Sequence, residues 1–433
     1  MDPVTVGYLS LIAIAIAIYA GLHVAIALAG ISLFRVWAIT GKLKLATSFV
    51  ALAATDSIAE YTFGVVPLFV LMGLAVSESG LGRDTFAIIA RGLQRWRAGL
   101  SVATVLSNAV FAAITGVSIA SAAVFSKVAV PEMVRAGTSR SIAVGVVAGS
   151  SVLGMLIPPS LLLILFAILT DSSVGDLFIG GIGPGLLLAF AYIAYLSILG
   201  FLRPDLFNMP REFESSDHVP TRAMLPILGL AATVLSGIYL GFFTPTEAGA
   251  VGAAAALIIG VAMRRIGRRE GWQIAVQTGH ITAAVSFLII GASIYSRMLA
   301  FSGLPAAITQ AAIDTGIGPT AFLLVFAAIL IVLGTVLDSS SIMLVTVPLA
   351  FPITQEMGID IVHFGLITVL AVEVGLLTPP LGLSVFVVHT TLRDTGITLG
   401  EVFRGAIPFA LIMAASLIAL IFYPQIATGL LGR

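Results

Sequence analysis

Two short polar sequences interrupt long apolar stretches of the chain, and their oxygen atoms could bind a cation. The first is Thr115-Gly116-Val117-Ser118, and the second is Leu337-Asp338-Ser339-Ser340-Ser341. Hydroxyl and carbonyl oxygens are the ligands that hard cations prefer. Asp338 adds an ionisable carboxyl group, and such groups within apolar segments are functional candidates. These residues are therefore candidate ligands of an alkali cation.

A pair of prolines follows each polar sequence. Pro158-Pro159 interrupts the apolar stretch 141–170, and Pro379-Pro380 interrupts the stretch 361–391. Proline has no N–H and clashes with the preceding turn, so two in succession end a helix. The carbonyl ends of the interrupted helices would attract a cation, and the amide ends would attract an anionic group. We therefore expect each proline pair to lie beside one polar sequence and to form part of a binding site.

The residue types at these positions predict at least two sodium sites and a substrate site. The first sodium site is predicted to contain Thr115, Gly116, Ser118, Gly154, Ile157 and Pro158. The second sodium site is predicted to contain Asp338, Ser339, Ser340, Gly375, Thr378 and Pro379. The predicted substrate contacts are Ser121, Pro159, Ser341, Glu373 and Pro380. The alternative role for the serines is to cap the ends of helices.

Other polar residues in the apolar stretches are predicted to be structural. Glu373 has an alternative role of this kind, because it could hydrogen-bond a neighbouring helix. Glu247 lies in Thr244-Pro245-Thr246-Glu247-Ala248, where it is predicted to cap a helix at a tight turn. Asn108 and His389 are predicted to be packed polar residues rather than ligands.

The composition requires that lipid surrounds these elements. The 433 residues are 59% hydrophobic and 10% charged, and the mean hydropathy is +1.13. A soluble domain carries about 25% charged residues. Roughly ten apolar segments are long enough to cross a bilayer at about 1.5 Å per residue. The sequence therefore predicts an all-α polytopic membrane protein.

The composition also excludes several classes of protein. Net charge is zero, which argues against a nucleic-acid partner. No cysteine is present, so no thiol nucleophile or cysteine-bound metal is possible. No phosphate-binding Gly-Lys loop is present, which argues against an ATP-driven pump, and no organic cofactor is expected. An intramembrane enzyme would need clustered Asp, His or Ser–His groups at one depth, which the sequence does not contain.

The polar sequences and proline pairs recur at a constant separation, which indicates an internal repeat. A shift of 221 residues pairs Ser118 with Ser339, Gly154 with Gly375, and Pro158-Pro159 with Pro379-Pro380. A shift of 223 pairs Ser79-Gly80-Leu81 with Ser302-Gly303-Leu304. Each repeat is predicted to contain a re-entrant helical hairpin, at 99–131 or 320–352, followed by a transmembrane helix broken at Pro-Pro.

Charged residues beside the two hairpins predict opposite orientations. The first hairpin is flanked by arginines, namely Arg91, Arg95, Arg97, Arg135 and Arg140. The second is flanked by acidic residues, namely Asp314, Glu356 and Asp360. Because cytoplasmic loops carry the excess of basic residues, the first hairpin is expected to enter from the cytoplasm and the second from outside. The repeats are therefore predicted to be inverted. Arg297 does not fit this pattern of charges. The pattern also does not indicate the path of residues 30–60, which include Lys42 and Lys44.

Five motifs, in order along the chain, resemble those of the DctM-like large membrane subunit of TRAP (tripartite ATP-independent periplasmic) transporters. They are Val66-Pro67-Leu68-Phe69-Val70-Leu71-Met72-Gly73, Val130-Pro131-Glu132-Met133, Leu156-Ile157-Pro158-Pro159-Ser160, Thr244-Pro245-Thr246-Glu247-Ala248 and Gly375-Leu376-Leu377-Thr378-Pro379-Pro380. The resemblance covers nearly the whole chain. It departs from the family at the first hairpin, where Thr115-Gly116-Val117-Ser118 replaces a Ser-Gly-Ser-Ser-type tip.

The resemblance implies sodium-coupled uptake of an organic acid, such as a dicarboxylate, across the bacterial inner membrane. The implied partners are a periplasmic substrate-binding protein, a small four-helix membrane subunit and the surrounding lipid. It also implies an elevator mechanism, in which a transport domain slides against a scaffold. The expected transport domain is 98–175 and 319–396, and the expected scaffold is 1–97, 176–318 and 397–433. The alternative is a standalone sodium- or proton-coupled carrier or exchanger with the same inverted hairpins.

Overall fold

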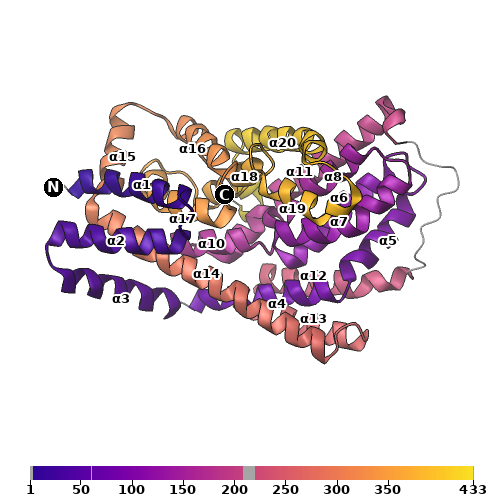
Figure 1. Cartoon of the computed structure of the whole chain (residues 1–433), viewed down its shortest axis with the longest axis horizontal. Helices are drawn as coiled ribbons and strands as arrows, with labels where there is room; N and C mark the ends of the chain where they lie inside the picture. Colours follow the sequence, from indigo (N-terminus) through magenta and orange to yellow (C-terminus); the bar gives the residue numbers. More distant parts are fainter. Residues whose placement is uncertain (1–2, 60, 208–219, 433) are drawn as a thin grey trace.

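The computed structural model describes residues 3–59, 61–207 and 220–432, and these residues fold almost entirely into helices (Figure 1). The described ranges contain no β-strand, and a single isolated bridge joins Thr138 to Phe207. The predicted all-α fold is therefore confirmed. Arg211, in the polar stretch 203–222 of the sequence, lies outside the described residues.

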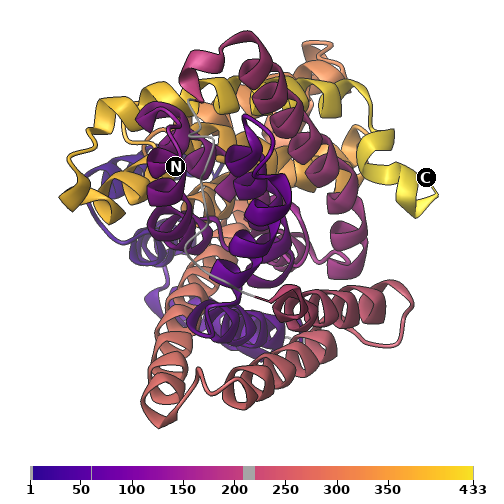
Figure 2. The same ribbon diagram turned by 90° about the vertical axis from the view of Figure 1, so that its right-hand side faces the viewer.

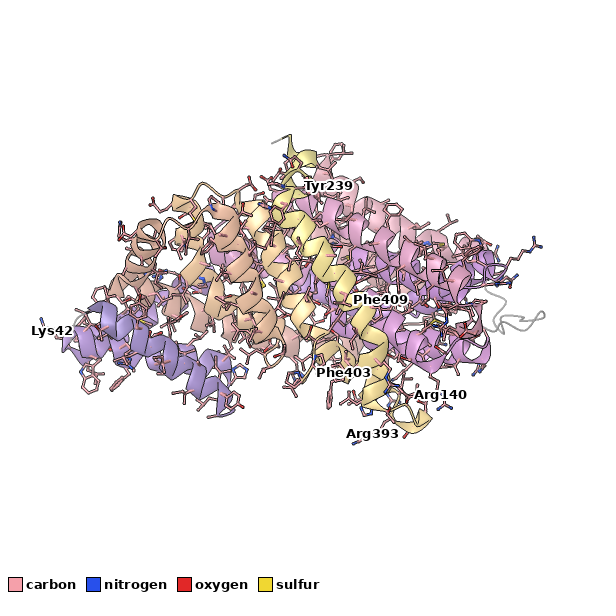
Figure 3. The ribbon with its side chains drawn as sticks, turned by 90° about the horizontal axis from the view of Figure 1, so that it is seen from above. Lys42, Arg140, Tyr239, Arg393, Phe403 and Phe409 are labelled. Atoms are coloured by element: carbon pink, nitrogen blue, oxygen red, sulfur yellow. The ribbon has the colours of Figure 1, made fainter. Side chains whose placement is uncertain are left out.

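Three antiparallel helices form the N-terminal end of the fold. They are α1 (Pro3–Tyr19), α2 (Val24–Thr40) and α3 (Leu43–Ala59). Both α2 and α3 pack against α14 (Arg268–Ser302), and the three helices lie together at one end of the molecule (Figure 1). Lys42, in the turn between α2 and α3, lies at one end of the molecule, far from Arg140 and Arg393 (Figure 3). The structure thus gives residues 30–59 a largely helical path that the charge pattern did not indicate.

Two short connections with a left-handed glycine each join a pair of helices that precedes a hairpin. The first joins α4 (Val65–Glu78) to α5 (Leu81–Leu93) with a bend of 59°. The second joins α14 to α15 (Leu304–Asp314). Gly80 and Gly303 stand at the two junctions, and both have a φ of 69°. Glycine adopts this left-handed conformation without a steric penalty, which explains the recurrence of Ser-Gly-Leu at both junctions.

The first helical hairpin and its broken helix follow α5. The hairpin consists of α6 (Gly99–Thr115) and α7 (Ser118–Arg135). The broken helix consists of α8 (Arg140–Ser151), the short α9 (Leu153–Leu156) and α10 (Leu161–Thr170). Both arms of the hairpin pack against α8.

The same succession of elements recurs in the second half of the chain. Its hairpin consists of α16 (Pro319–Gly334) and α17 (Ser339–Glu356), and its broken helix of α18 (Ile361–Leu376) and α19 (Leu383–Thr391). The helices end where the sequence predicts the breaks, because glycine and paired prolines stop helices through their backbones alone.

The remaining helices surround these two units. They are α11 (Val174–Leu202), α12 (Leu225–Tyr239), α13 (Pro245–Ala262), α20 (Leu399–Phe422) and α21 (Gln425–Thr428). Short 3₁₀ helices occur at Tyr61–Gly64, Pro204–Leu206, Thr221–Met224, Arg393–Thr395 and Gly429–Leu431. Helices α12 and α13 form an edge of the molecule on the side opposite α20 (Figure 2).

Six helices of the described ranges are long and apolar enough to cross a membrane, or seven if α4 and α5 form one bent span. The sequence predicts roughly ten such segments. The structure has fewer because several apolar helices, including α2, α6, α16 and α18, have 17 residues or fewer. Helix α18 is buried from Val362 to Leu376, so it forms the centre of the fold. Large apolar side chains on the outer helices are exposed, as expected of a multi-pass membrane protein.

Candidate functional site

The tip of the first hairpin lies directly against the first break. The Leu161 N–H donates a hydrogen bond of 3.2 Å to the Gly116 carbonyl. Gly116 has a φ of 62°, and a Cβ atom there would lie 2.5 Å from the Pro159 carbonyl oxygen. A Cβ atom on Gly154 would lie 3.3 Å from the Val117 carbonyl carbon. The structure therefore brings the predicted residues Gly116, Gly154 and Pro159 together, with the glycines permitting the close approach.

The first break is buried and its polar groups are partnered. Ser160 caps α10 by accepting from the Leu163 N–H at 3.3 Å, and its hydroxyl also donates to the Met155 carbonyl. Pro158 and Pro159, joined by a cis peptide, are buried, and Ile157 is extended and half-buried. Ser160 is not among the predicted site residues. The local sequence could have indicated its capping role, because a serine directly before an apolar stretch is often the N-cap residue of a helix.

The two hydroxyls at the first tip have different environments. The Thr115 hydroxyl donates to the Phe111 carbonyl at 3.0 Å, within its own helix. Ser118 is buried at the first residue of α7, where Val117 is the N-cap residue and makes no side-chain capping bond. Ser118 is therefore not the cap of this helix, and the capping alternative does not account for it.

Ser121, predicted to contact substrate, belongs to a buried hydrogen-bond network. Its hydroxyl donates to the Asn108 side-chain oxygen, and the Asn108 amide donates to the Ser150 hydroxyl at 2.6 Å. Ser150 in turn donates to the Val146 carbonyl. Asn108, Ser121 and Ser150 are completely buried and come from α6, α7 and α8. The prediction that Asn108 is a packed polar residue is confirmed, whereas its partner Ser150 was not predicted.

At the tip of the second hairpin, Asp338 caps a helix. It is the N-cap residue of α17, and its carboxylate accepts from the Ser341 N–H at 3.1 Å. The Ser341 hydroxyl donates to the same carboxylate. Asp338 is exposed, whereas Ser341 is buried. Asp338, a predicted sodium ligand, and Ser341, a predicted substrate contact, are therefore hydrogen-bonded to each other at the capped start of α17.

Ser339 and Glu373 meet in the interior beside this tip. The Ser339 hydroxyl donates to Oε1 of Glu373 at 3.1 Å. Glu373 is 1% exposed, and its Oε2 has no hydrogen-bond partner within the described part of the chain. A buried carboxylate oxygen without a partner is costly in an apolar environment. The arrangement therefore leaves one strong oxygen acceptor available beside Ser339, while Ser340 is half-buried at the same helix start.

The second break is held by backbone contacts and is open to the surface. The Leu381 N–H donates to the Thr335 carbonyl at 3.1 Å. A Cβ atom on Gly375 would lie 2.6 Å from the Cα atom of Gly334, so α16 and α18 touch through their backbones. The Thr378 hydroxyl donates to the Val374 carbonyl at 2.8 Å.

Of the prolines at the second break, Pro379 belongs to the predicted second sodium site and Pro380 to the predicted substrate site. Pro379 and Pro380 are joined by a cis peptide and are exposed, whereas Pro158 and Pro159 are buried. The contacts that join the second hairpin to its break are those of Thr335 with Leu381, Gly334 with Gly375 and Ser339 with Glu373.

The donors at both tips are hydroxyls, carbonyls and single carboxylates. Among the described residues, no three or more His, Asp or Glu side chains gather so that they could hold a metal ion. Oxygen donors of this kind suit a hard cation.

Two cavities that share Leu169 and Ser296 in their linings lie away from the proline pairs. One of about 240 Å³ is lined by residues of α3, α10 and α14, and an ion pair of 2.8 Å between Arg297 and Asp56 lies on its wall. The other, of about 550 Å³, is lined by α15 and by Pro348 and Pro352 of α17. The ion pair neutralises Arg297, which explains how an arginine is tolerated where the charge pattern does not expect one.

Glu247 and Thr244 form a reciprocal capping box at the start of α13. This confirms the predicted structural role of Glu247.

The sequence profile of one protein family matches residues 11–426. Its description is "Tripartite ATP-independent periplasmic transporter, DctM component". The chain belongs to this family. It is accordingly a multi-pass membrane permease of a transporter family rather than an enzyme.

Several curated relatives of the DctM family cover most of the chain. The C4-dicarboxylate TRAP transporter large permease protein DctM of Pseudomonas aeruginosa is 35% identical over 372 residues, which are 86% of each chain. The protein of the same name from Rhodobacter capsulatus is 31% identical over 88% of this chain and 89% of its own. The ectoine/5-hydroxyectoine large permease UehC of Ruegeria pomeroyi is 30% identical over 84% of each.

A solved structure shares the fold at low sequence identity. The MtrF protein of Neisseria gonorrhoeae, described as one of a class of antimetabolite efflux pumps, matches 98% of this chain and 95% of its own. The TM-score is 0.61 and the identity is 14%. This likeness concerns the arrangement of helices alone.

Proposed function

We propose that the chain is the large translocating subunit of a sodium-coupled uptake system for an organic acid in the bacterial inner membrane. The observation that carries the proposal is the pairing of each hydroxyl-bearing hairpin tip with a Pro-Pro break. Backbone breaks at membrane depth survive only where protein buries them or where they line a polar cavity. Two such breaks in one chain supply carbonyl ends for cations and amide ends for a carboxylate.

The predicted residues divide into two cation sites under this proposal. Ser118 and the break at Gly154–Pro158 hold the first sodium, with Thr115, Gly116 and Ile157. Ser339 and the break at Gly375–Pro379 hold the second, with Asp338, Ser340 and Thr378. The buried position of Ser118 and the absence of a capping bond from it support its assignment. The substrate carboxylate is bound by Ser121, Pro159, Ser341, Glu373 and Pro380.

Transport proceeds by an elevator movement of inverted repeats. The moving part consists of residues 98–175 and 319–396, and the scaffold of 1–97, 176–318 and 397–433. The bent connections at Ser79-Gly80 and Ser302-Gly303 support this division, because each lies where the scaffold leads into a hairpin. A left-handed glycine at each junction allows a change of direction over two residues.

The cargo and the partners are inferred from the relatives. Two of the relatives are C4-dicarboxylate permeases, so a dicarboxylate is the first substrate to test. The tripartite description of the family supports a periplasmic substrate-binding protein and a small four-helix membrane subunit as partners. The described residues include no separate domain outside the helical bundle that could select a substrate, so the binding protein would supply much of the specificity.

Reconstitution tests this proposal directly. Proteoliposomes that contain the chain, its small subunit and its binding protein should accumulate a radiolabelled C4-dicarboxylate when sodium is added outside. Replacing sodium with potassium at equal ionic strength should stop accumulation. Uptake by the chain alone would favour the standalone carrier, and sodium-independent uptake would contradict sodium coupling.

A further inference from the structure

The first hairpin is joined to its broken helix by a buried side-chain network that the second hairpin lacks. Asn108 of α6 accepts from Ser121 of α7 and donates to Ser150 of α8. The three side chains are completely buried. A single amide thus holds both arms of the hairpin and the helix against which they close.

The corresponding positions of the second unit are apolar. A shift of 221 residues places Ile329 opposite Asn108, Ile342 opposite Ser121 and Ala371 opposite Ser150. Ile342 and Ala371 are completely buried, whereas Ile329 is 49% exposed. Apolar contacts are non-directional, so they permit sliding and separation that a paired amide resists.

The second hairpin meets its broken helix beside a more exposed break. Within the described part of the chain, one side-chain pair joins α17 to α18, the bond between Ser339 and Glu373. The tip residue Asp338 and the prolines Pro379 and Pro380 are exposed. In the first unit, Ser118 and both prolines are buried. One side-chain bond joins hairpin and broken helix in each unit, Asn108–Ser150 in a closed interior and Ser339–Glu373 beside an exposed break.

We propose that Asn108 is a positioning residue that keeps the first hairpin closed on its break, so that the second hairpin is the one that opens to admit substrate. Opening the first hairpin would break the completely buried bond between Asn108 of α6 and Ser150 of α8 and leave the amide N–H group unpaired in an apolar interior. Opening the second hairpin breaks one hydroxyl–carboxylate bond. Asn108 acts on the first cation site through the hairpin tip, since it holds α7, which begins at Ser118. The link to cation binding rests on the proposed function, whereas the difference in opening does not.

The absence of cysteine makes the two tips separately measurable. The chain contains no cysteine, so a single Cys at Val117 or at Leu337 is a unique probe. Both positions are half-buried residues of a hairpin tip. In vesicles that hold the chain with its small subunit, Leu337→Cys should react with a charged maleimide faster than Val117→Cys. Adding Asn108→Ala should speed labelling of Val117→Cys at least about tenfold and leave Leu337→Cys unchanged.

Matched variants distinguish the positioning role of Asn108 from a general loss of packing in the first hairpin. Ser126 also lies completely buried on α7, and its hydroxyl has no partner within the described residues. Ser126→Ala should therefore change neither labelling rate. Ser121→Ala and Ser150→Ala each remove one bond of the network, and they serve if Asn108→Ala does not fold. Faster labelling at both tips together, or at neither tip in all three network variants, would overturn the proposal.

Sodium titration supplies a second readout and distinguishes the two proposals. If wild-type uptake depends on sodium, Asn108→Ala should raise the half-saturating sodium concentration about tenfold, and Ser126→Ala should not. A wild-type chain without sodium dependence would refute the sodium coupling, and the labelling experiment would still decide whether Asn108 closes the first hairpin. A sodium-dependent wild type with an unchanged half-saturating concentration in Asn108→Ala would overturn its positioning role.

Discussion

The two hairpin units share their backbone breaks but differ in the side chains that hold them together. Both have a short turn between hairpin arms, a glycine at a backbone contact and a Pro-Pro sequence in the neighbouring helix. The first unit adds a buried amide–hydroxyl network and encloses its break. The second adds a buried carboxylate and leaves its break exposed. The shared features are those that shape a binding site, and the differing features decide how tightly each unit closes.

The comparison also explains why the charged group lies in only one unit. Glu373 corresponds to Val152 under the shift of 221 residues, and Val152 is completely buried. A carboxylate at position 152 would meet an interior already closed by α6 and α7. In the second unit, Ser339 donates a hydrogen bond to Glu373 beside a break whose prolines are exposed.

The glycine contacts should give the largest effects, and the effects should be alike in the two units. Gly116→Ala forces a Cβ atom toward the Pro159 carbonyl in a left-handed conformation, and Gly375→Ala forces one against Gly334. Each should lower the free energy of unfolding by about 3 kcal/mol or more and abolish transport. Gly30→Ala, a helical site with no atom within 4 Å, is the control for both and should be neutral. Thermal unfolding in detergent measures the difference, and a neutral Gly116→Ala would break the comparison.

Removing the buried carboxylate of Glu373 should affect the sodium dependence of uptake, whereas a change at the matching position of the first unit should not. Glu373→Ala leaves the Ser339 hydroxyl unpaired and should cost about 2 kcal/mol of stability. Val152→Ala at the matching position removes apolar volume alone, so it should leave the sodium dependence of uptake unchanged while Glu373→Ala weakens it. Glu373→Gln retains an acceptor for Ser339 and should preserve folding. Equal sodium dependence in Glu373→Ala and the wild type would show that the carboxylate serves packing only.

Two variants of Asp338 should separate its role as the helix cap from any role of its charge in sodium binding. Asp338→Ala removes the bond from the Ser341 N–H and should cost about 1 kcal/mol. Asp338→Asn retains an N-cap acceptor, so its stability should match the wild type. If the carboxylate also binds sodium, both variants should raise the half-saturating sodium concentration. A defect in Asp338→Ala alone would assign the residue to capping.

The cap at the first break should give the smallest effect. Ser160→Ala removes the N-cap of α10 and should cost about 1 kcal/mol or less, since Gly116 still accepts from Leu161. The matching residue of the second unit is the exposed Leu381, so Leu381→Ala should be close to neutral. Chemical denaturation measures the free energy of unfolding of the two variants. A larger loss of stability in Leu381→Ala than in Ser160→Ala would contradict the capping role of Ser160.

Features encoded by the backbone could be predicted from the sequence. The prolines and glycines place both breaks and both hairpin tips, because their effects act within a few residues. The capping role of Glu247 was equally local, since Thr244 and Pro245 stand beside it. The number of spanning helices was overestimated, because apolar composition does not reveal where a helix stops short of a full span.

Side-chain pairing across the fold could not be predicted. Asn108 and Ser150 are 42 residues apart, and Ser339 and Glu373 are 34 apart. Arg297 and Asp56 are 241 residues apart, so the charge pattern alone left Arg297 unexplained. Such partners depend on how helices dock, and hydrophobic pattern fixes the buried face of a helix without fixing its polar neighbours.

The central claim is that two hydroxyl-bearing tips, each beside its own break, bind sodium. The most direct measurement is thermal stabilisation of the purified chain by sodium, with potassium at equal ionic strength as the reference. We expect the wild type to be stabilised by sodium alone, Ser118→Ala and Ser339→Ala to lose part of that stabilisation, and the double variant to lose all of it. Equal unfolding temperatures in sodium and potassium for the wild type, or full sodium stabilisation of the double variant, would contradict the account.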